Sequence, residues 1–196
     1  MKNITQLALN YVTQLFDEKL TDEFTYHNLS HTLEVLENVI EIGANTNITD
    51  EKLELVKVAA IFHDTGITDS CNEHELNSCK IAKEFLLKNN INNQKIEDIE
   101  QLIQSTNLKN IPITLGQKIL RDSDILHTGK KKFYSKSLKL KSEIENIEKK
   151  EIHELTWIDS TLEFINNNNY FTKYALENYS DKRQKNIIKL QKKKRR

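Results

Sequence analysis

The stretch VAAIFHDTGI (residues 58–67) ends an apolar helical segment on His63 and Asp64. Because so apolar a segment packs against other elements, the two polar residues at its end are drawn towards the interior. A buried carboxylate without a partner is costly, and a divalent cation is the simplest compensation. An imidazole beside a carboxylate suits Mn, Fe, Co, Ni or Zn, so the pair predicts a metal site.

Two further stretches offer ligands in similar apolar settings. In TYHNLSHTLEVLENVIEI (residues 25–42), His31 shares a helical face with aliphatic residues that follow it. In GQKILRDSDILHTG (residues 116–129), Asp122 and Asp124 lie among aliphatic residues, so at least one carboxylate should point inward. Three helices then supply two imidazoles and two carboxylates, which leave coordination positions open for water. Open positions are typical of a catalytic metal rather than a structural one.

The order H…HD…D, carried by His31, His63, Asp64 and Asp124, resembles the HD superfamily of metal-dependent phosphohydrolases over about residues 24 to 130. VAAIFHDTG resembles the superfamily's (A/L)xxHDxG motif, and ILRDSDIL resembles its DxDxL segment. The resemblance implies an all-α, single HD-type helical domain. It also implies that the second aspartate of the later segment, Asp124, is the ligand, and that Asp64 helps to position the ion for catalysis.

The motif YHNLSH (residues 26–31) is similar to the YHNxxHAxDV signature of class I cyclic-nucleotide phosphodiesterases. That resemblance implies that His27 contacts the substrate and donates a proton to the leaving oxygen, while His31 binds the metal. A histidine beside a metal can titrate near neutral pH, which suits a general acid. The chain departs from the signature at Thr32 and Glu34.

Several other residues are candidates for the site. His74, in a motif that resembles the family's HExxS, is expected to bind a substrate phosphate. The second histidine of two-metal relatives is replaced by Ser105 and Thr106, which favours one divalent ion (Mn, Fe, Co, Ni, Zn or Mg) over two. Asp69 and Glu73, in the loop after the HD pair, are candidates for orienting the attacking water.

Composition predicts a helical protein of one domain. The 196 residues are 37% hydrophobic and 30% charged, with one proline and four glycines, so long helices meet few interruptions. No stretch is long and apolar enough for a membrane span or a signal peptide, and two cysteines form no disulfide framework. We therefore expect a cytoplasmic location. The expected helices cover approximately residues 3–19, 29–43, 49–62, 74–89, 93–105, 114–127, 130–148, 151–167 and 171–190.

The helix at 130–148 is rich in lysine and glutamate, and we interpret it as solvent-exposed rather than as a lid. We divide the chain into a domain at 1–180 and a basic helix end and tail at 181–196. Residues 182–196 hold nine Lys or Arg and no acid, and this leaves a net charge of −9 on the rest. A solvated end is favoured over nucleic-acid binding through this tail. Five aromatic residues are expected to serve as packing rather than as a base-stacking platform: Trp157, Phe164, Phe171, Tyr174 and Tyr179.

The leading functional hypothesis is a phosphohydrolase that attacks a phosphate mono- or diester with a metal-activated water. The substrate is expected to be a nucleotide or another small phosphate. The alternatives are a non-catalytic sensor whose HD pocket binds a nucleotide, and, less favoured, a nucleic-acid-binding protein. No membrane partner is expected, and assembly into a homo-oligomer is left open by the sequence.

Overall fold

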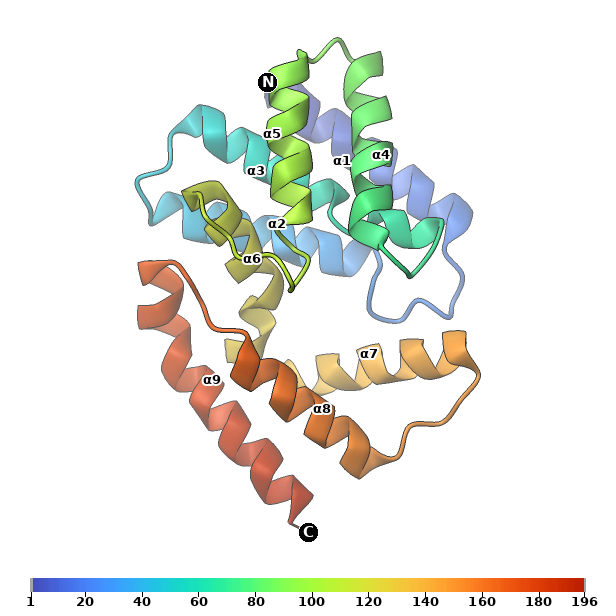
Figure 1. Ribbon diagram of the computed structural model, residues 1–196, viewed down its shortest axis with the longest axis vertical. Helices are drawn as coiled ribbons and strands as arrows, with labels where there is room; N and C mark the ends of the chain where they lie inside the picture. Colours follow the sequence, from blue (N-terminus) through green and yellow to red (C-terminus); the bar gives the residue numbers. More distant parts are fainter. Residues whose placement is uncertain (1, 196) are drawn as a thin grey trace.

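The computed structural model describes residues 2–195, with side chains from residue 4 onward, and all regular structure in this range is helical (Figure 1). The all-α prediction is therefore confirmed. The helices are α1 (Lys2–Lys19), α2 (Leu29–Ala44), α3 (Asp50–Phe62), α4 (His74–Lys88), α5 (Asn93–Gln104), α6 (Leu115–Ile125), α7 (Phe133–Glu148), α8 (Glu154–Asn167) and α9 (Lys173–Lys194). Two 3₁₀ helices, η1 (Thr65–Thr68) and η2 (Leu126–Gly129), follow α3 and α6.

Local capping explains why these helices begin where they do. The Thr49 side chain accepts a hydrogen bond from the backbone N–H of Lys52 at the start of α3, and two acids follow in the first turn. At the start of α6, Thr114 and Gln117 form a reciprocal capping box. Such signals are local in sequence, so the predicted helix boundaries lie within a few residues of the observed ones.

Helix α3 lies at the centre of the larger core. Every residue from Val58 to Phe62 is fully buried, because α1, α2, α5 and α6 pack around the helix. A helix that is apolar on all sides requires this surrounding. Its C-terminal end therefore delivers His63, with no exposed surface, and Asp64, which is 5% exposed, into the interior.

The three C-terminal helices form the lower body in Figure 1 and hold a second, smaller cluster of buried apolar residues. Its members are Phe133, Ile158, Ile165, Ile187 and Leu190. Asn186 of α9 ties this body to η2, because its side-chain amide donates to the carbonyl oxygens of Thr128 and Lys130. The division of the chain at residue 180 stays a prediction, and it falls inside the continuous helix α9.

The interpretation of the segment at 130–148 as a solvent-exposed helix was wrong. Phe133, Ser137 and Glu143 of α7 are all buried, at 2%, 6% and 1% exposure. Phe133 and Ser137 are four residues apart and share a face, whereas Glu143, six residues further on, lies about 120° round the helix from Ser137. Because two of the three are polar, hydropathy alone does not reveal that they are buried.

Some basic residues of the C-terminal helix are not free. The buried guanidinium of Arg183 donates to the carbonyl oxygens of Ile165 and Asn168, and Lys193 pairs with Glu154 on α8.

Among residues 2–195, no helix combines the length and apolar content that crossing a membrane requires.

Candidate metal centre

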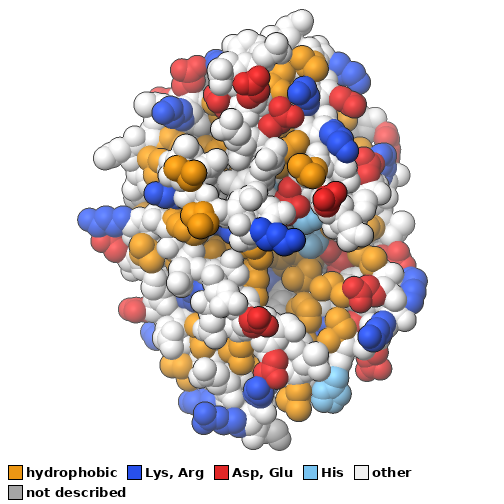
Figure 2. All heavy atoms as spheres, in the orientation of Figure 1, with side chains coloured by type: hydrophobic (Ala, Val, Ile, Leu, Met, Phe, Trp, Pro, Cys, Tyr) orange, Lys and Arg blue, Asp and Glu red, His pale blue; other side chains and the backbone are white. Residues whose placement is uncertain are grey.

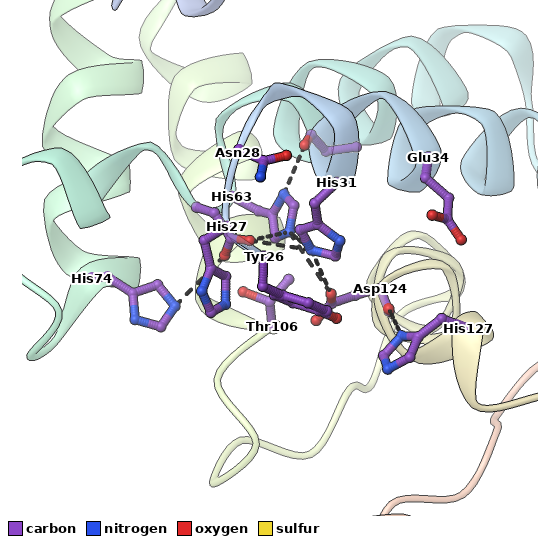
Figure 3. A network of polar contacts seen from close by, with 12 residues as sticks. Tyr26, His27, Asn28, His31, Glu34, His63, His74, Thr106, Asp124 and His127 are labelled. Carbon is purple, nitrogen blue, oxygen red and sulfur yellow. Dashed lines mark hydrogen bonds and ion pairs between the residues drawn. The ribbon is translucent and has the colours of Figure 1, made fainter. Parts of the chain in front are cut away.

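Ligand atoms from three helical segments converge at the end of α3 (Figure 3). The Nε2 atoms of His31 and His63 lie 3.3 Å apart. Asp64 Oδ2 lies 3.2 Å from the first of these atoms and 3.0 Å from the second. Asp124 Oδ1 lies 3.3 and 3.8 Å from the same two atoms. One ligand atom from each of His31, His63 and Asp124 thus lies within 4.8 Å of the other two, as in a site for a single ion.

These separations fit a shared divalent ion. Donor atoms bound at about 2.1 Å to one ion lie roughly 3 Å from one another. The Nδ1 of His63 lies 2.8 Å from the carbonyl oxygen of Ala60, so Nδ1–H donates there and the Nε2 lone pair is left for a cation. Two imidazoles and two carboxylates are a donor set that suits Mn, Fe, Co, Ni or Zn.

The electrostatics of the cluster also favour a cation. Burial lowers the pKa of His63, but the carboxylates of Asp64 and Asp124 outweigh burial and raise this pKa to about 9. Burial raises the pKa of the Asp64 carboxyl, yet His63 and His31 hold it well below its usual range. Positive charge is therefore stabilised between the carboxylates, and a divalent ion would compete with protons for these ligands.

The two aspartates of the DSD segment have different surroundings. Asp124 faces the histidines, whereas Asp122 is fully buried and accepts hydrogen bonds from the first residues of another segment. Its carboxylate accepts from the backbone N–H of Phe171 at 2.8 Å, and from the backbone N–H and the hydroxyl of Thr172, both at 2.7 Å. Asp122 therefore anchors the start of α9, since Thr172 is the N-cap of that helix.

His27 stands on the loop just before α2, because Asn28 rather than His27 is the N-cap of that helix. The ring centroid of His27 lies 6.0 Å from that of His31 and 6.2 Å from that of His74. Glu143 of α7 holds the loop: its Oε2 accepts from the backbone N–H groups of Tyr26 and His27 at 2.7 and 2.9 Å. Its Oε1 pairs with His27 Nδ1, so the Nε2 of His27 is left for the cavity that this residue lines.

The contact between His27 and Glu143 shifts the pKa of both side chains. Burial lowers the pKa of His27, but the hydrogen bond to Glu143 helps to raise it above its ordinary value. Burial raises the pKa of Glu143, but the His27 side chain and the backbone N–H groups of Tyr26 and His27 together lower it below its ordinary value. His27 is thus kept protonated at a higher pH than a free imidazole, which suits a proton donor. Sequence patterns missed Glu143, because KSEIENIEKK resembles any solvated helix.

His74 is near the cluster, with Nε2 at 3.6 Å from Asp64 Oδ1. The hydroxyls of Ser105 and Thr106 are occupied, since each donates to a carbonyl oxygen one turn earlier in its own chain segment. Neither is therefore oriented as a ligand, and His74 with Asp64 is a sparse donor set for a second ion.

The structure does not bring Asp69 or Glu73 to the cluster. Asp69 is half exposed and forms an ion pair with Lys19 at 3.0 Å. Glu73 is exposed in a left-handed conformation (φ 53°) at the start of α4. Neither side chain lines the cavity at the candidate metal centre. Asp69 and Glu73 were proposed because they lie in the loop that follows the HD pair. The 3₁₀ helix η1 intervenes and carries both residues away from the cluster.

A cavity of about 360 Å³ opens at the candidate metal centre and extends to α7 and α8. Trp157 and Phe164 line it, although sequence analysis assigned both to packing alone. His127 also lines it and was not identified from sequence. Its Nδ1 lies 3.0 Å from the carbonyl oxygen of Asp124, and burial lowers the pKa of His127 to about 4. Its position one helical turn after the proposed ligand Asp124 is the sequence feature that could have identified His127 as a cavity residue.

A protein-family model for the HD domain matches residues 28–129, just over half of the chain. The match includes all four candidate ligands and His74, and it excludes His27 and Glu143. No curated protein and no solved structure matches the chain.

Proposed function

The chain belongs to the HD domain family, and from this premise we propose that it is a metal-dependent phosphohydrolase acting on a small phosphate ester. The observation that carries the proposal is the convergence of four ligand atoms at one end of an accessible cavity. In this proposal His31, His63, Asp64 and Asp124 hold one divalent ion. Such an ion, when bound, supplies Lewis-acid chemistry: it activates water and neutralises charge on phosphoryl oxygens.

The residues of the chain divide the remaining tasks. His74 binds a phosphate oxygen, since its ring lies between the cluster and the rim of the cavity. His27 donates a proton from Nε2 of its imidazolium form to the leaving oxygen, and Glu143 stabilises this form and orients the ring through Nδ1. Because Asp69 and Glu73 lie outside the site, the Asp64 or Asp124 carboxylate accepts the proton of the attacking water in this proposal.

The first experiment is elemental analysis of the purified protein, followed by hydrolysis of a phosphate ester panel with several divalent ions. We expect near-stoichiometric transition metal, and we expect both metal and hydrolysis to be lost in His63→Ala. Full metal content in this variant would contradict the ligand assignment. Metal binding with no hydrolysis of any phosphate ester would favour the alternative of a non-catalytic sensor.

The second experiment addresses the proton donor. His27→Ala should retain metal but lose turnover by roughly 10²–10⁴-fold, because a general acid contributes about this much. The loss should be smaller for p-nitrophenyl phosphate, whose leaving group needs little protonation. An equal loss on activated and unactivated esters would show that His27 binds or supports structure instead.

A further inference from the structure

One part of the cavity lining is apolar. We call it the apolar chamber; it is formed by Ile125, Phe133, Leu140, Trp157 and Phe164. Figure 2 shows hydrophobic side chains gathered around a hollow in the middle of one face, with histidine atoms at its edge. Three of the five residues are aromatic, so the chamber offers flat surfaces at a volume suited to a small molecule.

The basic side chains of the cavity lining are the histidines His27, His74 and His127. Among residues 2–195, no lysine or arginine side chain lines it, whereas the acids Asp64, Glu75 and Asp124 do. The nearby Lys136 pairs with Glu34 outside the lining. One phosphate can be neutralised by an ion at the candidate metal centre, but a second or third phosphate would meet carboxylates and find no lysine or arginine in the lining.

The polar groups that α7 and α8 contribute to the cavity lining mostly form hydrogen bonds within these two helices. Trp157 Nε1 donates to Ser137 Oγ at 2.8 Å, and the Thr161 hydroxyl donates to the carbonyl oxygen of Trp157 at 2.7 Å. His127 is different: its Nδ1–H donates to the Asp124 carbonyl, and its Nε2 has no partner among the described residues. That nitrogen is a hydrogen-bond acceptor at the chamber, available to an N–H or O–H of a ligand.

We propose that the substrate carries a single phosphate on an uncharged, ring-bearing group, as in a nucleoside monophosphate or an aryl phosphate, and that polyphosphates are rejected. The phosphate sits at the metal ligands and the ring occupies the apolar chamber. Water forms the new bond to phosphorus as the ester bond breaks, and the leaving oxygen takes its proton from His27. This inference rests on the proposed function and extends it to a substrate class.

The direct test compares kcat/KM of the metal-loaded enzyme for adenosine 5′-monophosphate, adenosine 5′-triphosphate and glycerol 2-phosphate. The monophosphate should exceed the triphosphate by about 100-fold or more, because unneutralised like charges cost several kcal/mol. It should exceed glycerol phosphate by about tenfold or more, because a base stacks on aromatic side chains and glycerol does not. Equal or better use of the triphosphate would overturn the inference.

A charge placed in the apolar chamber gives a gain-of-function test. Leu140→Lys puts a cation beside the ring site, and it should narrow the preference for monophosphate over triphosphate by about tenfold. Leu138→Lys is the matched control: Leu138 lies on the same helix, is 39% exposed and does not line the cavity. An unchanged preference in folded, metal-containing Leu140→Lys, or the same change in both variants, would contradict the assigned role of the chamber.

A second pair of variants tests the size of the chamber. Ser160 is exposed at the rim of the cavity, so Ser160→Trp should fold while it narrows the space for a ring. We expect a loss for adenosine monophosphate of about tenfold or more and little change for glycerol phosphate. The control is Thr156→Trp, one turn earlier on the exposed surface of α8 and outside the lining.

If neither phosphate is hydrolysed by the wild-type enzyme with any metal, the proposed function fails. If both are hydrolysed without discrimination, only this inference fails.

Discussion

Asp122 and Asp124 are two residues apart, yet the structure gives them separate tasks, so alanine at each position should produce opposite results. Asp122→Ala removes the acceptor for two backbone N–H groups and one hydroxyl at the start of α9. Hydrogen bonds to a charged group are each worth about 1.5–3 kcal/mol. Burial raises the pKa of Asp122 to about 6, so part of this gain is offset by desolvation of the carboxylate.

The net loss of unfolding free energy is therefore about 2–4 kcal/mol for Asp122→Ala. For a chain of this size, 1 kcal/mol shifts the melting temperature by about 2–4 °C, so a decrease of about 5–15 °C is expected. Metal content, measured well below the melting temperature, should be retained. Asp124→Ala should lose the metal, and in EDTA its melting temperature should change less than that of Asp122→Ala.

The assay is thermal unfolding by circular dichroism at pH 8 in EDTA, where Asp122 is ionised, together with elemental analysis of the folded proteins. The reasoning is refuted if Asp122→Ala loses metal at an unchanged melting temperature, or if Asp124→Ala keeps its full metal content. Either result would mean that the wrong aspartate has been assigned to the candidate metal centre.

Two further predictions concern groups that line the cavity or hold its residues. Glu143→Gln should lower kcat by about 10–100-fold with metal retained. Because Glu143 raises the pKa of His27, the alkaline limb of the pH–rate profile should also move to lower pH in this variant. An alkaline limb that does not move would argue that Glu143 does not contact the proton donor. The pKa of His127 is about 4 in the folded protein, below its ordinary 6.5, so the unfolded chain takes up a proton first as pH falls between these values. Stability should then fall by up to about 3 kcal/mol across that window, and urea unfolding in EDTA should show a smaller fall in His127→Gln; an identical pH dependence in the two proteins would contradict this.

The features that local sequence determines were predictable. Helix starts followed from side chains such as Thr49 and from acids in the first turn, which act within three or four residues. The gathering of His31, His63 and Asp124 followed from their apolar neighbours together with a family resemblance. His31 and Asp124 lie on helices with apolar residues at helical spacing, and His63 directly follows a helix end that is apolar on all sides.

The features that depend on distant partners were not predictable. Glu143 acts on residues 116 and 117 positions earlier, and nothing in its own segment distinguishes it from the solvated glutamates nearby. Trp157 has the pattern of a core residue and is indeed 8% exposed, but which space it borders depends on how α8 meets α6 and α7. Asp69 was named because it follows the HD pair, whereas its partner is Lys19 on α1.

The residues that match the HD family end at 129, and four of the five residues of the apolar chamber come later in the chain. The candidate metal ligands thus lie within the family match, and most of the apolar lining follows it in the chain. Mutations after residue 129 can retune which molecule is accepted without disturbing the ligands of the ion. A graft of the segment from α7 to α8 would therefore have to keep Glu143, because this residue holds the loop that carries His27.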